Sequence, residues 1–175
     1  MDSRGVINPV LAAIICTLFF LSQTDGALVQ RLIMDACKRS DNYKSCLVVL
    51  RQNPRISSAT NAKSLAKIAL ETVIKESGSV QAFLVRTTKS YPRAAKPLRS
   101  CVLYFEDTKK ELVLRDDDLE AGVASMDVHT ALDSVESCEN ALASAKVGIP
   151  AVGERIRKWK VLFGPALGAV YLAEN

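Results

Sequence analysis

The stretch CKRSDNYKSC, residues 37–46, decides how this chain starts to fold. Its two cysteines stand nine positions apart with polar residues between them, and apolar residues recur at helical spacing on either side. This pattern predicts two short helices joined at residues 38–42, with Asp41 as the N-cap of the second. Isolated helices of this length are marginal in water, so a bond between Cys37 and Cys46 would stabilise the hairpin. A pair of metal ligands and a redox pair are the other interpretations of these cysteines.

The first 26 residues differ from the rest of the chain. Val10–Leu21 is an apolar run of twelve residues that follows Arg4, and small residues stand at Thr24 and Gly26. This predicts a secretory signal peptide over residues 1–26, cleaved before Ala27. A membrane anchor is the alternative, but a spanning helix needs roughly 20 apolar residues. We therefore expect a secreted domain over residues 27–175, with no membrane association after cleavage.

Cleavage would also make the number of cysteines even. It removes Cys16 and leaves four, and an even number in a secreted chain is typical of two disulfides. Four cysteines allow three pairings. Closing a short loop costs little entropy, which favours Cys37–Cys46 together with Cys101–Cys138. Zinc is less favoured, because His129 is the only histidine and four-cysteine zinc sites have tightly spaced pairs. A redox role lacks its C-x-x-C motif.

Helical periodicity continues through the rest of the chain, and no strand-type alternation of comparable length competes with it. We predict an all-α fold: an up-and-down four-helix bundle preceded by a short disulfide-pinned α-hairpin. A core face from Val123 to Leu142, including Asp127 and Thr130, is expected on the third bundle helix. We expect Val147–Gly153 to form a loop and Gly164-Pro165 to interrupt the last helix. The four bundle helices are predicted within residues 64–90, 97–112, 123–142 and 156–171.

Catalytic and ligand-binding motifs are missing from the sequence. It contains no nucleophile elbow, phosphate-binding loop, dinucleotide fingerprint or H-E-x-x-H motif, and Asp116–Asp118 lacks the spacing of a calcium loop. The formal net charge of +4 is too small and too evenly spread to indicate nucleic-acid binding. We therefore predict that the protein is not an enzyme and has no catalytic residues, cofactor, metal or nucleic-acid partner.

Several spacings resemble the plant invertase and pectin methylesterase inhibitor family. CKRSDNYKSCLVVL followed by SATNAKSLAKIALE is similar to the opening of that family, and PLRSCVLYFEDTKKEL to its helix with the third cysteine. HTALDSVESCENAL and ALGAVYL resemble its last two helices, so the resemblance covers essentially all of residues 27–175. The matching positions are Cys37, Tyr43, Cys46, Leu50, Leu65, Ala66, Ala69, Cys101, Ala131, Leu132, Cys138 and Glu139.

The resemblance implies an inhibitor that does no chemistry itself. It implies an extracellular helical protein with the same two disulfides, which covers the substrate cleft of pectin methylesterase or invertase in a 1:1 complex. The expected location is the cell wall or apoplast, with the vacuole as the alternative. Docking by the bundle helices makes exposed polar residues of the second and third helices the candidate contacts: Glu106, Lys109, Lys110, Asp127 and His129.

One departure from the family separates the two target enzymes. Invertase inhibitors often carry a Pro-Lys-Phe element near the start of the third bundle helix, where this chain has Ala121-Gly122-Val123. The departure favours pectin methylesterase as the target, with invertase as the alternative. A secreted carrier of small apolar ligands and a non-inhibitory scaffold protein are further alternatives that the sequence leaves open.

Overall fold

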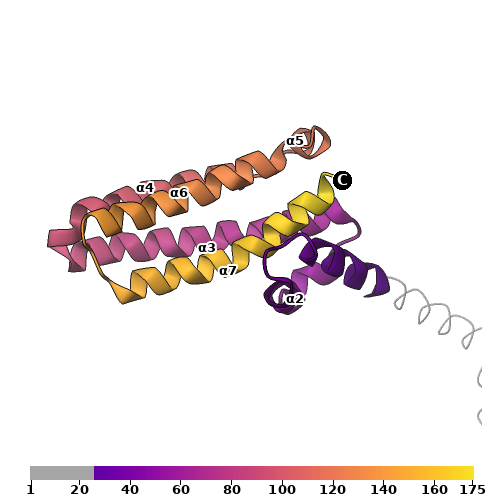
Figure 1. Ribbon diagram of the computed structural model, residues 1–175, viewed down its shortest axis with the longest axis horizontal. Helices are drawn as coiled ribbons and strands as arrows, with labels where there is room; N and C mark the ends of the chain where they lie inside the picture. The colour runs from indigo at the N-terminus through magenta and orange to yellow at the C-terminus, as the bar shows by residue number, and fades with distance from the viewer. Residues whose placement is uncertain (1–25) are drawn as a thin grey trace, which may run out of the picture.

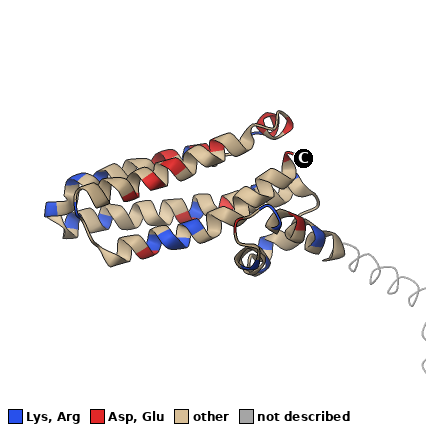
Figure 2. Cartoon of the chain, viewed as in Figure 1, with Lys and Arg blue, Asp and Glu red and all other residues tan. Residues whose placement is uncertain are grey.

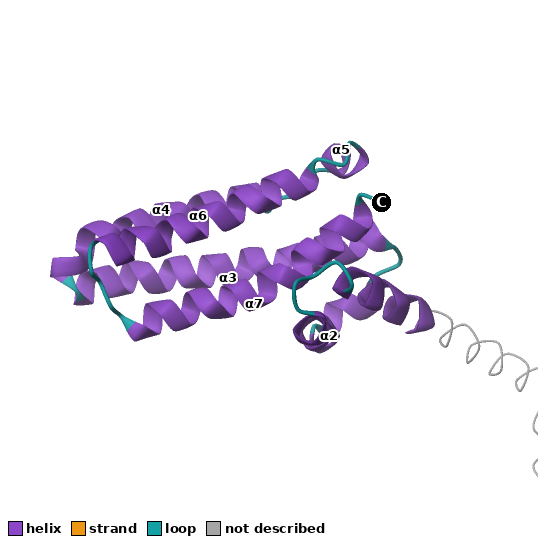
Figure 3. Cartoon of the chain, viewed as in Figure 1, coloured by secondary structure: helices purple, strands orange, loops and turns teal. Residues whose placement is uncertain are grey.

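The structure, a computed structural model, describes residues 26–175, which are helical apart from short connections and include no β-strand (Figure 3). Four long helices lie antiparallel to one another, and a pair of short helices packs at one end of them (Figure 1). This confirms the predicted bundle with an N-terminal hairpin. The long helices are α3 (Ala62–Ser90), α4 (Ala95–Glu111), α6 (Ala124–Ser144) and α7 (Pro150–Ala173).

The predicted signal peptide over residues 1–26 lies outside the described residues, apart from Gly26. Among the helices that the structure describes, none is long and apolar enough to cross a membrane.

The hairpin consists of a helix over residues 26–37 and helix α2 (Tyr43–Gln52), joined by the disulfide Cys37–Cys46 with a Cα–Cα distance of 5.4 Å. The predicted N-cap was wrong by one residue. Asn42, not Asp41, caps α2, because its side chain accepts a hydrogen bond from the Ser45 amide at 3.0 Å. The short 3-10 helix η1 (Pro54–Ser58) then leads the chain into the bundle.

Helix α7 runs without a break from Pro150 to Ala173, so two predictions about this region were wrong. The expected loop over residues 147–153 ends earlier, because Pro150 occupies the first turn, where a missing N–H does no harm. Gly164-Pro165 does not interrupt the helix either. Pro165 removes one intrahelical hydrogen bond. The Pro165 side chain is buried, and residues 164–168 pack directly against the hairpin, which supports the helix at this point.

Short elements connect α3, α4 and α6. Helix α3 begins at a capping box formed by Asn61 and Ser64 and passes through Gly78 without dividing. The 3-10 helix η2 (Pro92–Ala94) joins it to α4. The short helix α5 (Asp116–Glu120) precedes α6, and its acidic residues reach back to the first turns of α3.

The core of the bundle is centred on Trp159, which is fully buried. Its ring stacks on Phe163 with 4.9 Å between centroids and meets Phe105 edge-on at 6.2 Å. The indole N–H donates to Ser77 Oγ at 2.7 Å, so the one polar atom of the ring is satisfied.

The predicted core face of α6 was rotated from the observed one in its first half. Val123, Asp127 and Thr130 are exposed, whereas the side chains that enter the core belong to a different stripe. In the second half of the helix the prediction was correct for Ala131, Cys138 and Leu142, which are buried. The buried stripe comprises Ala124, Val128, Ala131, Val135, Cys138 and Leu142.

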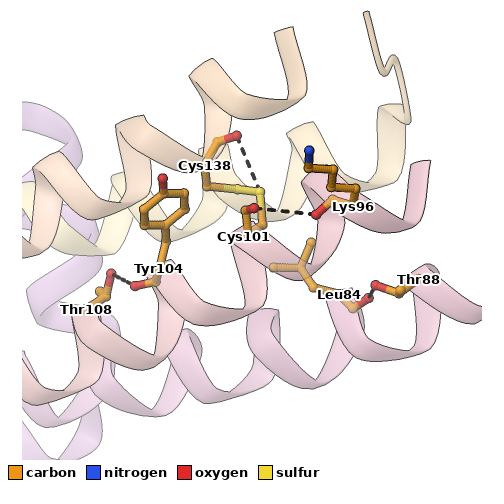
Figure 4. Close-up of a disulfide and its surroundings, with 8 residues drawn as sticks. Leu84, Thr88, Lys96, Cys101, Tyr104, Thr108 and Cys138 are labelled. Atoms are coloured by element: carbon orange, nitrogen blue, oxygen red, sulfur yellow. Dashed lines mark hydrogen bonds between the residues drawn. A yellow bond between two sulfur atoms is a disulfide. The ribbon is translucent and has the colours of Figure 1, made fainter. Parts of the chain in front are cut away.

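The disulfide Cys101–Cys138 links α4 to α6 inside this core, with a Cα–Cα distance of 4.6 Å (Figure 4). Both cysteines are fully buried. Two turns further along, the Thr108 hydroxyl lies 3.4 Å from the carbonyl oxygen of Ala131. Together these contacts fix the antiparallel register of the two helices, so residues near 110 lie level with residues near 129.

Candidate functional site

The five candidate contact residues lie on α4 and α6 but do not form one continuous surface. Glu106 and Lys110 are exposed on α4, one turn apart. The Lys110 ammonium lies 3.0 Å from Asp107 and 3.8 Å from Glu106. The hydrogen bond that Lys110 donates to Asp107 is the main reason why the pKa of Lys110 is raised above its ordinary value. These charges are solvated and available to a partner.

Lys109 points elsewhere and has an internal role. It is half-buried and donates a hydrogen bond to Gln81 Oε1 of α3 at 2.7 Å. The Gln81 amide nitrogen in turn donates to the carbonyl oxygen of Val102 at 3.3 Å. Lys109 therefore helps to join α3 to α4, and the structure separates it from the exposed pair on α4.

Asp127 lies beside a group of carboxylates between α4 and α6. At its centre is Glu111, which is half-buried and whose Oε2 atom has no hydrogen-bond partner among the described residues. Burial raises the pKa of Glu111 above its ordinary value, and the charges of Asp107 and Asp127 raise it further. Sequence reasoning missed Glu111, although Asp107 and Glu111 stand four residues apart, where like charges face each other on a helix.

His129 is directed toward α7 rather than toward Asp127, because residues two apart lie on opposite sides of a helix. Its Nε2 atom shares a hydrogen bond with the Tyr171 hydroxyl at 2.6 Å. The pair lies at the edge of a cleft of about 290 Å³ between the hairpin turn, α6 and α7. A cleft forms here because α6 and α7 touch along less of their length than the other neighbouring helices do.

Sequence reasoning did not predict this cleft, because its walls come from three distant segments. Lys160 of α7 crosses it to reach Glu139 of α6 at 2.6 Å. The lining is both apolar and charged, so the cleft can contact polar and apolar atoms of a ligand at the same time. The cleft is lined by Arg39, Asp41, His129, Leu132, Glu136, Lys160, Phe163 and Tyr171, among others.

Charge is unevenly distributed around the candidate residues. Residues 106–145, which contain the end of α4, α5 and α6, carry eleven acidic and three basic residues. Figure 2 shows the acidic residues gathered along α4, α6 and α5, and basic residues at the opposite end of the bundle and along α7. A surface of one sign steers an oppositely charged partner and fixes its orientation.

Exposed apolar side chains accompany the charges. Leu103 and Val113 are about 60% exposed, and Met126 is 68% exposed. Among the described residues, no group of three or more His, Cys, Asp or Glu side chains could hold a metal ion. Charged residues mixed with exposed Leu, Val and Met are suited to contact another protein, since such surfaces combine apolar anchors with a polar rim.

The fold resembles that of solved inhibitor structures. The crystal structure of a mutant form of a pectin methylesterase inhibitor from Arabidopsis matches with a TM-score of 0.61 and 24% identity, over 77% of this chain and 91% of that one. A crystal structure of a pectin methylesterase inhibitor from Arabidopsis thaliana matches with a TM-score of 0.54 and 23% identity, over 79% and 93% of the two chains.

A comparison with curated proteins finds no match. The family model of the plant invertase/pectin methylesterase inhibitors matches residues 31–164, which include most of the hairpin, both disulfides and most of the bundle. Members of that family are protein inhibitors and not enzymes. This chain therefore belongs to the plant invertase/pectin methylesterase inhibitor family and is an inhibitor of one of these two enzymes.

Proposed function

We propose that this protein inhibits pectin methylesterase by placing its bundle across the substrate cleft of the enzyme. The observation that carries the choice of target is the turn Ala121-Gly122-Val123 between α5 and α6. Gly122 has a φ of +69°, in the left-handed region that favours glycine. The backbone of this turn therefore favours glycine at the position where the element associated with invertase inhibition carries lysine.

The surface that contacts the enzyme in this proposal is formed by the exposed side chains of α4 and α6. Glu106, Lys110 and Asp127 provide charge there, and Leu103 and Met126 provide apolar anchors. The buried Cys101–Cys138 bond supports the surface by tying the two helices together. A surface that is rigid before binding loses little entropy in the complex, which favours tight inhibition.

The cellular setting of the proposal is the cell wall. The family is extracellular, and we propose that residues 1–26 direct secretion, leaving residues 27–175 as the inhibitor. One inhibitor would bind one enzyme molecule, since a single α4–α6 surface is available on each chain. The vacuole is the corresponding location if the target is invertase.

A titration of the purified protein against both enzymes tests the proposal. We expect inhibition of pectin methylesterase with an endpoint of one inhibitor per enzyme. Because the inhibitor covers the substrate cleft, the apparent KM for pectin should rise while kcat stays unchanged. Inhibition of invertase alone would overturn the choice of target, and a lowered kcat at constant KM would overturn the mechanism. Tight binding of a fluorescent lipid without any inhibition would instead favour the carrier alternative.

A further inference from the structure

The end of the bundle far from the hairpin carries a concentration of unpaired positive charge, here named the cationic cap. All of its residues are exposed, and none takes part in an ion pair within residues 26–175. The segments that build this end, residues 77–105 and 140–153, contain no acidic residue. Figure 2 shows basic residues at this end of the molecule. The cationic cap comprises Arg86, Lys89, Arg93, Lys96, Arg99 and Lys146.

The helix connections bring these six residues together. Five of them lie at the end of α3, in η2 and in the first turns of α4, so they surround one tight turn. Lys146 lies in the connection that follows α6. Because Cys101–Cys138 holds α4 and α6 antiparallel, the end of α6 and Lys146 lie at the same end of the bundle as the start of α4.

Stability of the fold accounts for only part of this charge. The start of α4 has no acidic residue in its first turn, and its N-cap, Ala94, makes no side-chain capping bond. Positive side chains oppose the dipole at a helix N-terminus, so Arg93 and Lys96 weaken α4 slightly. Lys89 in the last turn of α3 and Lys146 after α6 instead complement the dipoles of those helices. Elsewhere the bundle neutralises such residues, as at Lys63 with Glu120 and Lys67 with Asp116. The charges at the start of α4 therefore do not stabilise that helix, and an anionic ligand would neutralise them together with the rest of the cationic cap.

Tyr91 indicates what kind of anion fits. It lies at the turn between α3 and α4, within the cationic cap, and its side chain is 49% exposed. An aromatic ring with a hydroxyl group offers an apolar face for the ring of a sugar and a polar atom for its hydroxyl groups. The surrounding ammonium and guanidinium groups pair with carboxylates, and guanidinium can do so with two hydrogen bonds.

We propose that the cationic cap binds an acidic polysaccharide whose sugar units carry carboxylates, namely pectin from which methyl esters have been removed. This inference rests on the proposed function, because the product of pectin methylesterase is this polymer. The cationic cap lies at one end of the bundle, whereas most acidic residues of 106–139 lie further along α4, α6 and α5 toward the other end, where they repel a polyanion (Figure 2). The inhibitor would therefore be held in the cell wall with its α4–α6 surface free.

Binding to the polymer in the absence of any enzyme tests the proposal. The probes are polygalacturonate, fully methyl-esterified pectin as the uncharged counterpart, and poly-L-glutamate as a polyanion without sugar rings. One variant removes three charges of the cationic cap (Arg93→Gln, Lys96→Gln and Arg99→Gln), and a second replaces Tyr91 with Ala. The matched control removes three exposed, unpaired charges elsewhere: Lys44→Gln, Arg51→Gln and Lys75→Gln.

The parent protein should bind polygalacturonate at about 50 mM salt, lose most of its affinity at about 300 mM, and ignore the esterified polymer. The triple cap variant should lose about 10- to 100-fold in affinity, and the control less than about threefold. Tyr91→Ala should weaken binding to polygalacturonate but not to polyglutamate. An equal loss in the control variant, or equal affinity of the parent for both polyanions, would overturn the proposal. Inhibition of pectin methylesterase by the cap variant is measured separately, so failure of either proposal is recognised independently.

Discussion

At the scale of single residues, Glu106 and Lys110 offer the cleanest test of the inhibitory surface. Exchanging them (Glu106→Lys with Lys110→Glu) keeps the net charge and keeps opposite charges one helical turn apart. Surface ion pairs contribute little to stability, but the exchange also places a carboxylate at position 110 beside Asp107, so the free energy of unfolding should fall by no more than about 1 kcal/mol. If the pair faces the enzyme, the inhibition constant should rise about tenfold, because each charge then meets the wrong partner charge.

The matched control exchanges Asp35 and Lys38, which form an ion pair at 2.8 Å on the hairpin. This exchange should leave the inhibition constant of pectin methylesterase within about twofold of the parent value. Equal inhibition by both exchanged variants and the parent would remove the outer face of α4 from the contact surface.

Sequence patterns predicted some residues of this protein well and others poorly, for physical reasons. The structure contains both cysteine pairs that loop closure favoured. The core stripe of α6 was misjudged because residues 121–131 are small or weakly apolar and define no steep hydrophobic face. The spacing of Glu111 from Asp107 was visible in the sequence, but the burial of Glu111 was not, because it depends on the packing of α6 against α4.

At the scale of helices, the packing of α7 against the hairpin depends on Gly168. A Cβ atom at this position would lie 2.6 Å from the Ala36 carbonyl oxygen and 3.3 Å from the Ser40 Cβ atom. Because a backbone atom cannot move aside cheaply, Gly168→Ala should destabilise the protein by about 1–3 kcal/mol. Equilibrium unfolding in urea measures this change.

Gly164→Ala is the matched control on the same helix. Its added Cβ atom would meet only the Ser40 hydroxyl, at an ordinary contact distance of 3.7 Å. Alanine also favours a helix over glycine by up to about 1 kcal/mol, so this variant should be as stable as the parent or more stable. Equal stability of the two variants would show that the hairpin adjusts to α7 without strain.

The same contact explains which helices the sequence could predict. The four bundle helices have long periodic faces, and their number, order and direction follow from the pattern. The continuity of α7 does not follow from it, since Gly164-Pro165 weakens a helix locally. Packing against the hairpin supports this segment, and tertiary contacts of this kind are absent from a linear pattern.

At the scale of the whole molecule, the two disulfides stabilise parts with different roles. They close loops of 9 and 37 residues, and loop entropy assigns about 3 kcal/mol to Cys37–Cys46 and about 4 kcal/mol to Cys101–Cys138. Replacing either pair with alanine should lower the free energy of unfolding by about these amounts. Alanine is preferred to serine because all four positions are fully buried and alanine adds no polar group there.

The effects on inhibition should differ more than the effects on stability. Without Cys37–Cys46, amide hydrogen exchange should quicken in the hairpin alone, and inhibition should persist, because the proposed contact surface lies on α4 and α6. Without Cys101–Cys138, the register of these two helices loses its covalent link, so inhibition should weaken together with stability. Hydrogen-exchange mass spectrometry and the pectin methylesterase assay on the same two variants measure both outcomes. Loss of inhibition in the hairpin variant, with exchange in α4 and α6 unchanged, would place the inhibitory contact on the hairpin instead.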